Sequence, residues 1–412
     1  MKLNKLTQLT ALSMTLLGAS TFAASNDALL DLLVKKGVLS DTEATNVAAE
    51  LKAADKGVGF SAKGKETVKL RFNGRMQAQY DSLGATYSNV DQATTNHFYF
   101  RRLFFGTKAT LSNGIYAESV FNVAGEDFSF DKAIIGYKFD DALTGVVGYQ
   151  KVPFGFEETS SSSKLPTIER SAANRFFADD IDFSSRHMGL HAKGKLGGGF
   201  SYAAAVVNAV QGEGSKLGGS AEADNDMAFF GRLQWKNDGL TIGIDGGAQS
   251  NNTKVYQGKT ADKTPYGTND ITAFTGYVNY KLDGLDVLGE YFMGDLGDAG
   301  DVDAYTLRVS YKIDKFEPVI RYAHVKADKF EIDTDELIRR APNGGTEGSL
   351  GASETFAADG SENEIDSFYI GANYYFSKAV TFMAGYEMAE AKDSSGGKSE
   401  VDGFRARVQV LW

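Results

Sequence analysis

The stretch "TVKLRFNGRMQAQYD" at residues 67–81 alternates strictly between apolar and polar side chains. One set of alternate positions carries Val, Leu, Phe, Gly, Met, Ala and Tyr, and the other carries Lys, Arg, Asn, Arg, Gln, Gln and Asp. A period of two residues is typical of an extended strand with one apolar and one polar face. In a soluble sandwich the apolar face would point into a core. In a membrane barrel it would face lipid, and the charged face would line a hole.

Composition narrows the class of protein. The formal net charge of −11 gives no reason to expect a nucleic-acid partner. The chain has no Cys, which excludes disulfides and thiolate metal sites. Aromatic residues make up 12% of the chain and Gly (46) far outnumbers Pro (5), as expected for short strands joined by tight turns. Nothing in the sequence calls for a cofactor.

The first 23 residues are typical of a secretory signal peptide. Lys2 and Lys5 precede an apolar stretch, and Thr21-Phe22-Ala23 offers small residues for cleavage after Ala23, with Ala24 as the alternative. A membrane-anchoring helix is the other reading, but the apolar stretch is short for a span. No later segment has about 18 uninterrupted apolar residues. We therefore predict an exported protein without transmembrane helices.

Residues 24–58 form a separate segment with helical character. Within residues 26–54, "NDALLDLLVKK" places apolar residues on one stripe, and Gly37 suits a helix end. The "SDTE" run at residues 40–43 is a capping box for a second helix. This predicts a periplasmic helical hairpin, which would either trimerise as a coiled coil or pack on the rim of the main domain.

The pattern of the main domain, residues 59–412, predicts an all-β barrel. Most of its predicted strands have about ten residues or more, the length that crosses a membrane when tilted. Short turns alternate with longer polar connections, which describes an outer-membrane barrel better than a soluble sandwich or a solenoid. The prediction is a transmembrane antiparallel 16-stranded β-barrel in the outer membrane of a Gram-negative bacterium. Its strands are 66–81, 96–111, 114–124, 128–140, 144–152, 184–195, 199–210, 225–236, 240–250, 270–282, 285–294, 302–313, 316–326, 365–376, 379–390 and 401–412.

The predicted inward face is basic although the chain is acidic. About fourteen Lys and Arg share it with only about five acids, and much of the acid lies in loops such as 327–364. A ring or ladder of basic side chains in a pore favours anions. The alternative is that these basic residues are ordinary water-exposed side chains paired with neighbouring acids. The predicted lumen-lining residues include Lys69, Arg71, Arg75, Arg232, Arg308, Arg405 and Arg407.

Four stretches resemble the phosphate-selective porins of the O and P type. They are "FYFRRLFFGTKATL" (98–111), "FDKAIIGYKF" (130–139), "VVGYQKVPFGFEE" (146–158), and "TIERSAANRFF" (167–177) followed by "SSRHMGLHAKG" (184–194). The resemblance implies a homotrimer of 16-stranded barrels in outer-membrane lipid, each with its own channel for small anions such as phosphate. It also implies that the long third external loop, here residues 153–183, folds inward and narrows the pore.

Carried over by position, the resemblance places Arg101 or Arg102, Asp131 and Lys151 near the constriction. Lys164, Arg170, Arg175 and Arg186 are basic residues in or beside the loop, and their roles follow only from position. Arg101 and Arg102 cannot both face inward in an ideal strand, because neighbours alternate. One of them must sit on a bulge, at the rim, or against another subunit.

Other chemistry has weaker support. His187 and His191 are four residues apart, but on a strand they are better read as pore-lining imidazoles than as a metal pair, and no metal site is predicted. The acidic "GDLGDAGDVD" at residues 294–303 is better read as a solvated turn than as a Ca²⁺ loop. No Ser, His and carboxylate set converges on one face, so we predict a non-enzymatic protein. A structural or adhesive barrel with a plugged lumen is the alternative function.

Overall fold

The computed structural model describes residues 58–61, 67–87, 90–124, 129–209, 226–252, 254–257, 264–265, 269–341, 362–393 and 397–412. The chain divides into two compact units, Met1–Arg71 and Phe72–Trp412. The predicted signal peptide and helical hairpin lie outside the described residues. In the first unit, a strand that was not predicted, β1 (Val58–Ser61), pairs antiparallel with the start of β2 (Thr67–Tyr87), with Val58 opposite Leu70.

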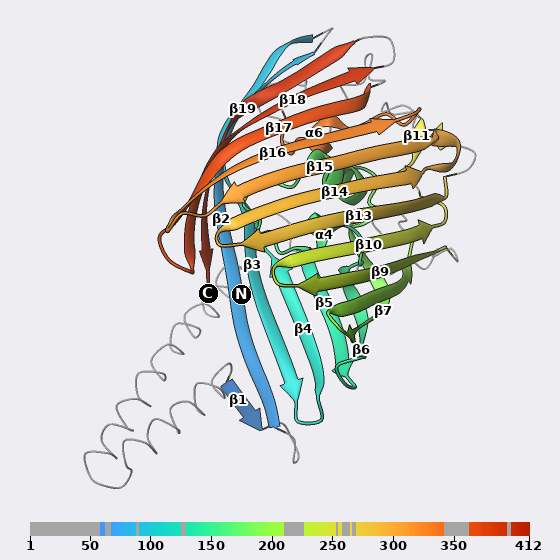
Figure 1. Cartoon of the computed structure of the whole chain (residues 1–412), viewed down its shortest axis with the longest axis vertical. Coiled ribbons are helices and arrows are strands. Elements are labelled where there is room, and N and C mark those ends of the chain that lie inside the picture. Colours follow the sequence, from blue (N-terminus) through green and yellow to red (C-terminus); the bar gives the residue numbers. More distant parts are fainter. Residues whose placement is uncertain are drawn as a thin grey trace, which may run out of the picture. The chain divides into compact units, whose positions relative to one another are not determined.

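Sixteen strands within the described residues close into an antiparallel barrel (Figure 1). Closure comes from the last strand pairing with the first, from Leu411 opposite Arg75 to Ser399 opposite Tyr87. The barrel strands after β2 are β3 (Val90–Leu111), β4 (Ile115–Asn122), β5 (Ser129–Lys138), β6 (Thr144–Lys151), β7 (Arg186–Gly197), β8 (Phe200–Asn208), β9 (Met227–Asn237), β10 (Leu240–Gln249), β13 (Ile271–Leu282), β14 (Leu285–Asp295), β15 (Asp301–Tyr311), β16 (Phe316–Ala327), β17 (Glu362–Tyr375), β18 (Val380–Asp393) and β19 (Lys398–Leu411).

Each of the sixteen predicted strands has its counterpart in the barrel, and the largest errors are at strand ends. β2 runs six residues beyond the predicted end at residue 81, and β3 starts at Val90 instead of residue 96. Small and turn-forming residues obscured the alternation there. The inward positions Leu83 and Ala85 nevertheless continue it, because both are buried.

Tight turns join the strands at one end of the barrel. Asp283 and Gly284 connect β13 to β14 with φ of 46° and 91°, and Asp238 and Gly239 connect β9 to β10 in the same left-handed region. Two consecutive positive φ angles match the right-handed twist of the flanking strands, which is why Asp-Gly occupies these turns. The long connections leave from the opposite end, as predicted.

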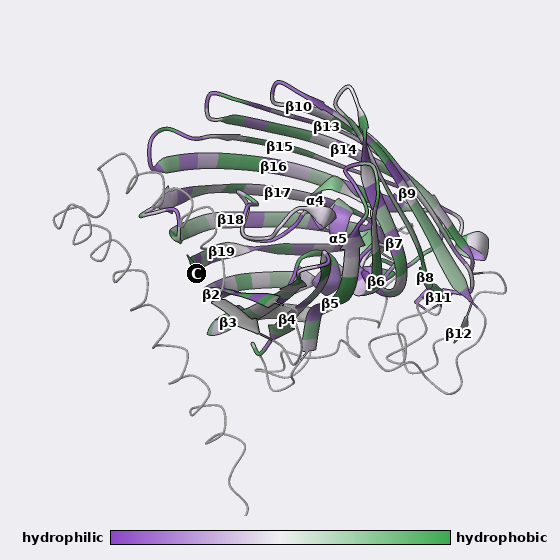
Figure 2. Ribbon diagram, turned by 90° about the horizontal axis from the view of Figure 1, so that it is seen from below, coloured by the Kyte–Doolittle hydropathy of each residue, from purple (hydrophilic) through white to green (hydrophobic). Residues whose placement is uncertain are grey.

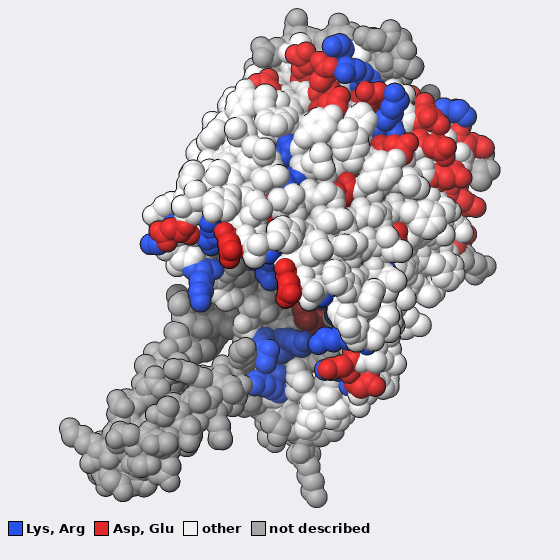
Figure 3. Space-filling model, in the orientation of Figure 1, with Lys and Arg blue, Asp and Glu red and all other residues white. Residues whose placement is uncertain are grey.

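The barrel is apolar outside and polar inside, the reverse of a soluble fold. Leu190 and Ile244 are 63% and 62% exposed on the outer face, whereas Arg405 and Arg407 are almost fully buried on the inner face. Figure 3 shows a broad band with little charge over the strands, with Lys, Arg, Asp and Glu gathered toward its edges. This arrangement suits a barrel that meets lipid around its circumference.

Short elements occupy the connections. They are α4 (Phe156–Thr159), α5 (Ala172–Arg175), the π-helical turn η2 (Phe176–Asp180), β11 (Tyr256–Gln257), β12 (Thr264–Pro265), the 3₁₀ turn η3 (Gly297–Ala299) and α6 (Thr334–Leu337). Among the described residues, no helix has the length and apolarity needed to cross a membrane. Figure 2 shows α4 and α5 inside the ring of strands.

Candidate functional site: the interior of the barrel

The connection between β6 and β7, residues 152–185, folds into the lumen and is here called the inward loop. Barrel carboxylates accept hydrogen bonds from its backbone at its start: Gly155 N donates to Asp245 Oδ2 at 2.9 Å and Phe156 N donates to Glu290 Oε1 at 2.5 Å. Farther along, Arg321 of β16 donates to the carbonyl of Glu169 at 2.7 Å. The loop therefore crosses the lumen toward β16, as the resemblance implied.

A dry aromatic cluster fills the lumen at the long-loop end. Rings from the inward loop pack on rings from the wall, with centroids 5.1 Å apart for Phe177 and Phe292 and 5.0 Å for Phe183 and Phe230. Small inward residues of the wall, such as Ala228 and Ala273, make room for these rings. The cluster was not predicted. The signal was present in the sequence, since the inward positions at the long-loop ends of these strands are Ala and Val instead of polar residues.

A second loop, residues 328–341, follows β16 and covers part of the inward loop. Phe330 packs edge-on against Phe176 with ring centroids 5.6 Å apart. Asp333 N donates to Asp180 Oδ2 at 3.1 Å. The sequence indicated only an acidic connection here, so this second inward element is a finding of the structure.

An open cavity of about 860 Å³ remains between the inward loop and strands β2 to β9. Its wall includes residues of β2 to β9 as well as both loops. Eleven of its lining residues are Lys or Arg and three are Asp or Glu, so the open part of the lumen is strongly basic. The basic residues are Arg75, Arg101, Arg102, Lys132, Lys151, Arg170, Arg175, Arg186, Lys193, Arg232 and Arg339, and the acids are Asp131, Glu158 and Asp179.

Arg101 and Arg102 both face inward because the alternation of β3 slips by one residue between them. Before the slip, Tyr99 points inward and donates to Asp81 Oδ2 at 2.7 Å. After it, Phe104 is buried and lies 4.5 Å beneath the guanidinium of Arg75. A β-bulge produces a slip of one residue. A bulge is one of the three arrangements that the sequence analysis allowed for this pair of arginines.

Most cations of the cavity have an acidic partner. Arg186 contacts Asp131 at 2.5 Å, and Lys151 and Arg170 both pair with Glu158 of the inward loop. Burial raises the pKa of Glu158, but the nearby Arg170 and Lys151 outweigh it and lower that pKa to about 2. Glu158 is therefore ionised at any ordinary pH.

Arg75 and Arg102 differ from these cations. Within the described residues, neither has a carboxylate within ion-pair distance. Arg102 donates to the amide oxygen of Gln77 at 2.9 Å, and Arg75 lies over the Phe104 ring. Their charge is therefore not cancelled by a direct acidic partner, which leaves it available to attract an anion.

Several residues predicted to line the lumen are covered instead. Arg308, Arg405 and Arg407 point inward as their positions predict, but their side chains are at most 3% exposed. Arg308 lies 3.6 Å from Glu157 and Arg407 lies 2.6 Å from Glu169, both acids of the inward loop. For Arg308 and Arg407 the cause is that the inward loop lies over this part of the wall and its acids pair with them. Arg405 instead pairs with Asp81 and Glu387, two acids of the wall itself.

The remaining residues predicted for the lumen differ in their position relative to the cavity. Arg232 lines the cavity and pairs with Asp245 at 2.6 Å. Lys164 is exposed on the inward loop but is not among the lining residues. Lys69 and Arg71 belong to the N-terminal unit, and their place in the lumen stays a prediction.

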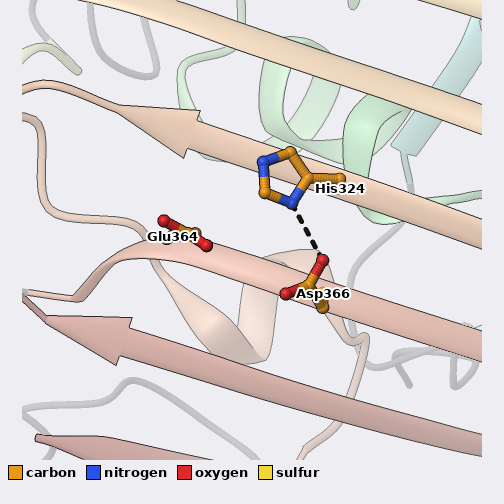
Figure 4. Close-up of side chains that lie close together, drawn as sticks. All are labelled: His324, Glu364 and Asp366. Atoms are coloured by element: carbon orange, nitrogen blue, oxygen red, sulfur yellow. Dashed lines mark hydrogen bonds and ion pairs between the residues drawn. The ribbon is translucent and has the colours of Figure 1, made fainter. Parts of the chain in front are cut away.

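His187 is buried against backbone carbonyls, whereas His191 lines the open cavity. The two ring nitrogens of His187 lie 3.0 Å and 3.1 Å from the carbonyl oxygens of Asn208 and Phe183. In the described residues, one group of His, Asp and Glu has ligand atoms within 4.8 Å of one another, namely His324, Glu364 and Asp366 (Figure 4). Lysine side chains already pair with its carboxylates, Lys326 at 3.0 Å and Lys392 at 3.8 Å. The group is satisfied as an ion-pair network.

Comparison with known proteins agrees with this geometry. Residues 70–182 match the family model described as phosphate-selective porin O and P. The chain is 23% identical over 395 residues to Porin O of Pseudomonas aeruginosa strain PAO1, covering 83% of this chain and 88% of the relative.

Solved structures share the fold at low sequence identity. An anion-selective porin from Comamonas acidovorans is 12% identical with a TM-score of 0.56, covering 84% of this chain and all of that chain. The outer membrane channel DcaP of Acinetobacter baumannii is also 12% identical with a TM-score of 0.56, covering 86% of this chain and all of that chain.

A closed barrel of sixteen antiparallel strands, apolar outside and narrowed by an inward loop, is the structure of an outer-membrane porin. Such proteins form channels in the outer membrane of Gram-negative bacteria. The matched stretch and the relative show that the chain is similar to the phosphate-selective porins of the O and P type. A pore of this kind needs no bond-making chemistry, and the family and fold are consistent with a non-enzymatic channel.

Proposed function

We propose that this porin conducts small solutes with a preference for anions, phosphate among them. The observation that carries the proposal is the lining of the open cavity, where eleven Lys and Arg outnumber three acids. Preorganised cations replace water around a permeating anion, and binding must stay weak enough for release. The matching phosphate-selective family and the similar anion-selective porin of Comamonas acidovorans support the same direction.

The test is a reversal-potential measurement on purified porin in planar bilayers. A KCl gradient should give the sign of anion preference, and clear cation preference would contradict the proposal. Phosphate is tested separately, by adding it to one side while chloride carries the current. A concentration-dependent block of chloride current supports a phosphate site, and unchanged current contradicts one.

The channel is further proposed to assemble as a homotrimer in outer-membrane lipid. The support is the family resemblance and the similar fold of OmpT from Vibrio cholerae, which has been solved in a trimer form (13% identical, TM-score 0.52). Chemical cross-linking in detergent should give a ladder ending at three subunits. A ladder that ends at one subunit would contradict it.

A plugged barrel with a structural or adhesive role is the second candidate. It is favoured by the aromatic cluster that fills the long-loop end of the lumen, with Phe154, Phe176 and Phe177 fully buried. Liposome swelling separates the two functions. An open porin admits small sugars and the liposomes swell, whereas a plugged barrel leaves them unchanged.

A further inference from the structure

The second loop, residues 328–341, is held firmly in the lumen. Its apolar side chains Phe330, Ile332, Leu337 and Ile338 are at most 3% exposed and belong to the aromatic cluster. Burial of these four side chains stabilises the loop in this position, because each removes apolar surface from water. The position of the loop is therefore part of the folded barrel.

Two arginines bind the end of this loop through its backbone. Arg175 of the inward loop donates from Nε to the carbonyl oxygens of Glu336 at 2.5 Å and Leu337 at 3.1 Å. Arg405 of β19 donates to the carbonyl of Arg339 at 2.8 Å. The backbone of Arg339 is thus fixed both by the inward loop and by the barrel wall.

The side chains of the neighbours Arg339 and Arg340 go to different places. Arg339 lines the open cavity together with Arg101, Arg175 and Asp179. Arg340 instead stacks on the Tyr99 ring at 3.8 Å and is not among the residues that line the cavity. The loop therefore presents one cation to the channel and uses the next for packing.

The charge of Arg339 is only weakly compensated. Its one ion pair within the described residues, to Glu336 at 3.5 Å, joins two side chains that are each about a third or more exposed, and pairs of this kind contribute little. Its Nε is buried and has no hydrogen-bond partner in the part of the chain that the structure describes. The nearby Arg101, followed by burial, lowers the pKa of Arg339, as expected where like charges are held together.

We infer that Arg339 is a specificity-determining residue of the channel, which adds a fixed cation at the long-loop mouth and draws anions toward the basic cavity. This inference rests on the proposed anion preference. The second loop, which follows β16, then contributes to selectivity together with the inward loop. Capture at one mouth also makes the current asymmetric with voltage, because the added charge lies at one end of the pore.

The experiment compares Arg339→Gln with Arg340→Gln in planar bilayers under a KCl gradient. For Arg339→Gln we expect the anion-to-cation permeability ratio to fall roughly 2- to 5-fold, the size expected for one unit charge in a partly hydrated pore. Arg340→Gln should leave the ratio unchanged. Arg339→Lys should restore most of the preference, since it keeps the charge.

Glu336→Gln separates charge from structure. It removes the acid beside Arg339, so it should raise anion preference, opposite in sign to Arg339→Gln. A loop that acts only as packing would shift both variants in the same direction or neither, and that result would overturn the inference. Folding of each variant is checked by heat-dependent mobility on SDS gels.

The measurements distinguish a failure of the inference on Arg339 from a failure of the proposed anion preference. If wild-type porin prefers anions and Arg339→Gln matches Arg340→Gln, the inference on Arg339 is wrong and the proposed function stands. If wild-type porin prefers cations, the proposed function is wrong.

Discussion

At the scale of single residues, the basic side chains of the lumen fall into two groups with different partners. Arg75 and Arg102 lie in the open cavity, where their described partners are neutral, among them an aromatic ring and an amide. Arg407 is buried against Glu169 at 2.6 Å. Both groups lie on the lumen-facing side of their strands. The difference between them therefore comes from the residues that cover one group and leave the other open.

Charge reversal at Arg102 should therefore act on selectivity. In Arg102→Glu, a cation without a carboxylate partner becomes an acid among cations, and we expect anion preference to be lost or inverted in reversal-potential measurements. Lys138→Glu is the matched control, because its side chain is 58% exposed outside the cavity and pairs with Asp141. Equal effects of the two substitutions would contradict a role for the position of Arg102.

Acid should affect the inward loop only at low pH. The pKa of Glu158 is lowered from 4.5 to about 2, so its ionised form stabilises the fold above pH 4.5. That contribution is lost as the pH falls from 4.5 toward about 2. Single-channel current should be steady from about pH 7 to about pH 5 and become noisy below about pH 4. Glu158→Gln should be noisy across the whole range, and a wild-type change near neutral pH would contradict this account.

At the scale of elements, Glu169 joins the inward loop to three strands of the barrel. Its carboxylate pairs with Arg101 of β3 at 2.8 Å and Arg407 of β19 at 2.6 Å, while its carbonyl accepts from Arg321 of β16. Burial opposes its ionisation, but Arg101 and Arg407 lower its pKa well below the usual range. One loop residue therefore neutralises two arginines, one at the open cavity and one that is buried.

Glu169→Gln should destabilise the barrel. Removing the acid of a buried ion pair leaves uncompensated charges and costs about 3–5 kcal/mol. Urea unfolding in detergent measures this loss. The control is Glu390→Gln, since that acid pairs with Lys392 and Lys398 at the exposed rim, where about 0–1 kcal/mol is expected. A loss of similar size in both variants would rule out the central role of Glu169.

At the scale of the whole molecule, the outward apolar face should tolerate charge according to depth in the membrane. Leu190 lies in the middle of β7 and Leu196 near its short-turn end, and both are about 60% exposed on the outer face. Leu190→Arg should cost about 2–4 kcal/mol and Leu196→Arg only about 0–1 kcal/mol. Reversible unfolding from lipid vesicles tests the pair, and equal costs would contradict the membrane orientation.

The sequence predicted the elements well and their ends poorly. Period-two alternation depends only on local geometry, so all sixteen barrel strands were predictable. The ends of β2 and β3 were missed because small residues follow Asp81, and β1 was missed because a strand of four residues has too little pattern.

The sequence by itself determined which side of each strand faces the lumen, that the lumen is basic, and that residues 153–183 are long enough to enter it. Only the tertiary structure decided which cations remain open. Contacts such as Glu169 with Arg407 join residues 238 positions apart, and no local pattern encodes the path of a loop across a barrel. That path covers Arg308 and Arg407, which pair with the loop acids Glu157 and Glu169, and it leaves Arg75 and Arg102 beside the open cavity.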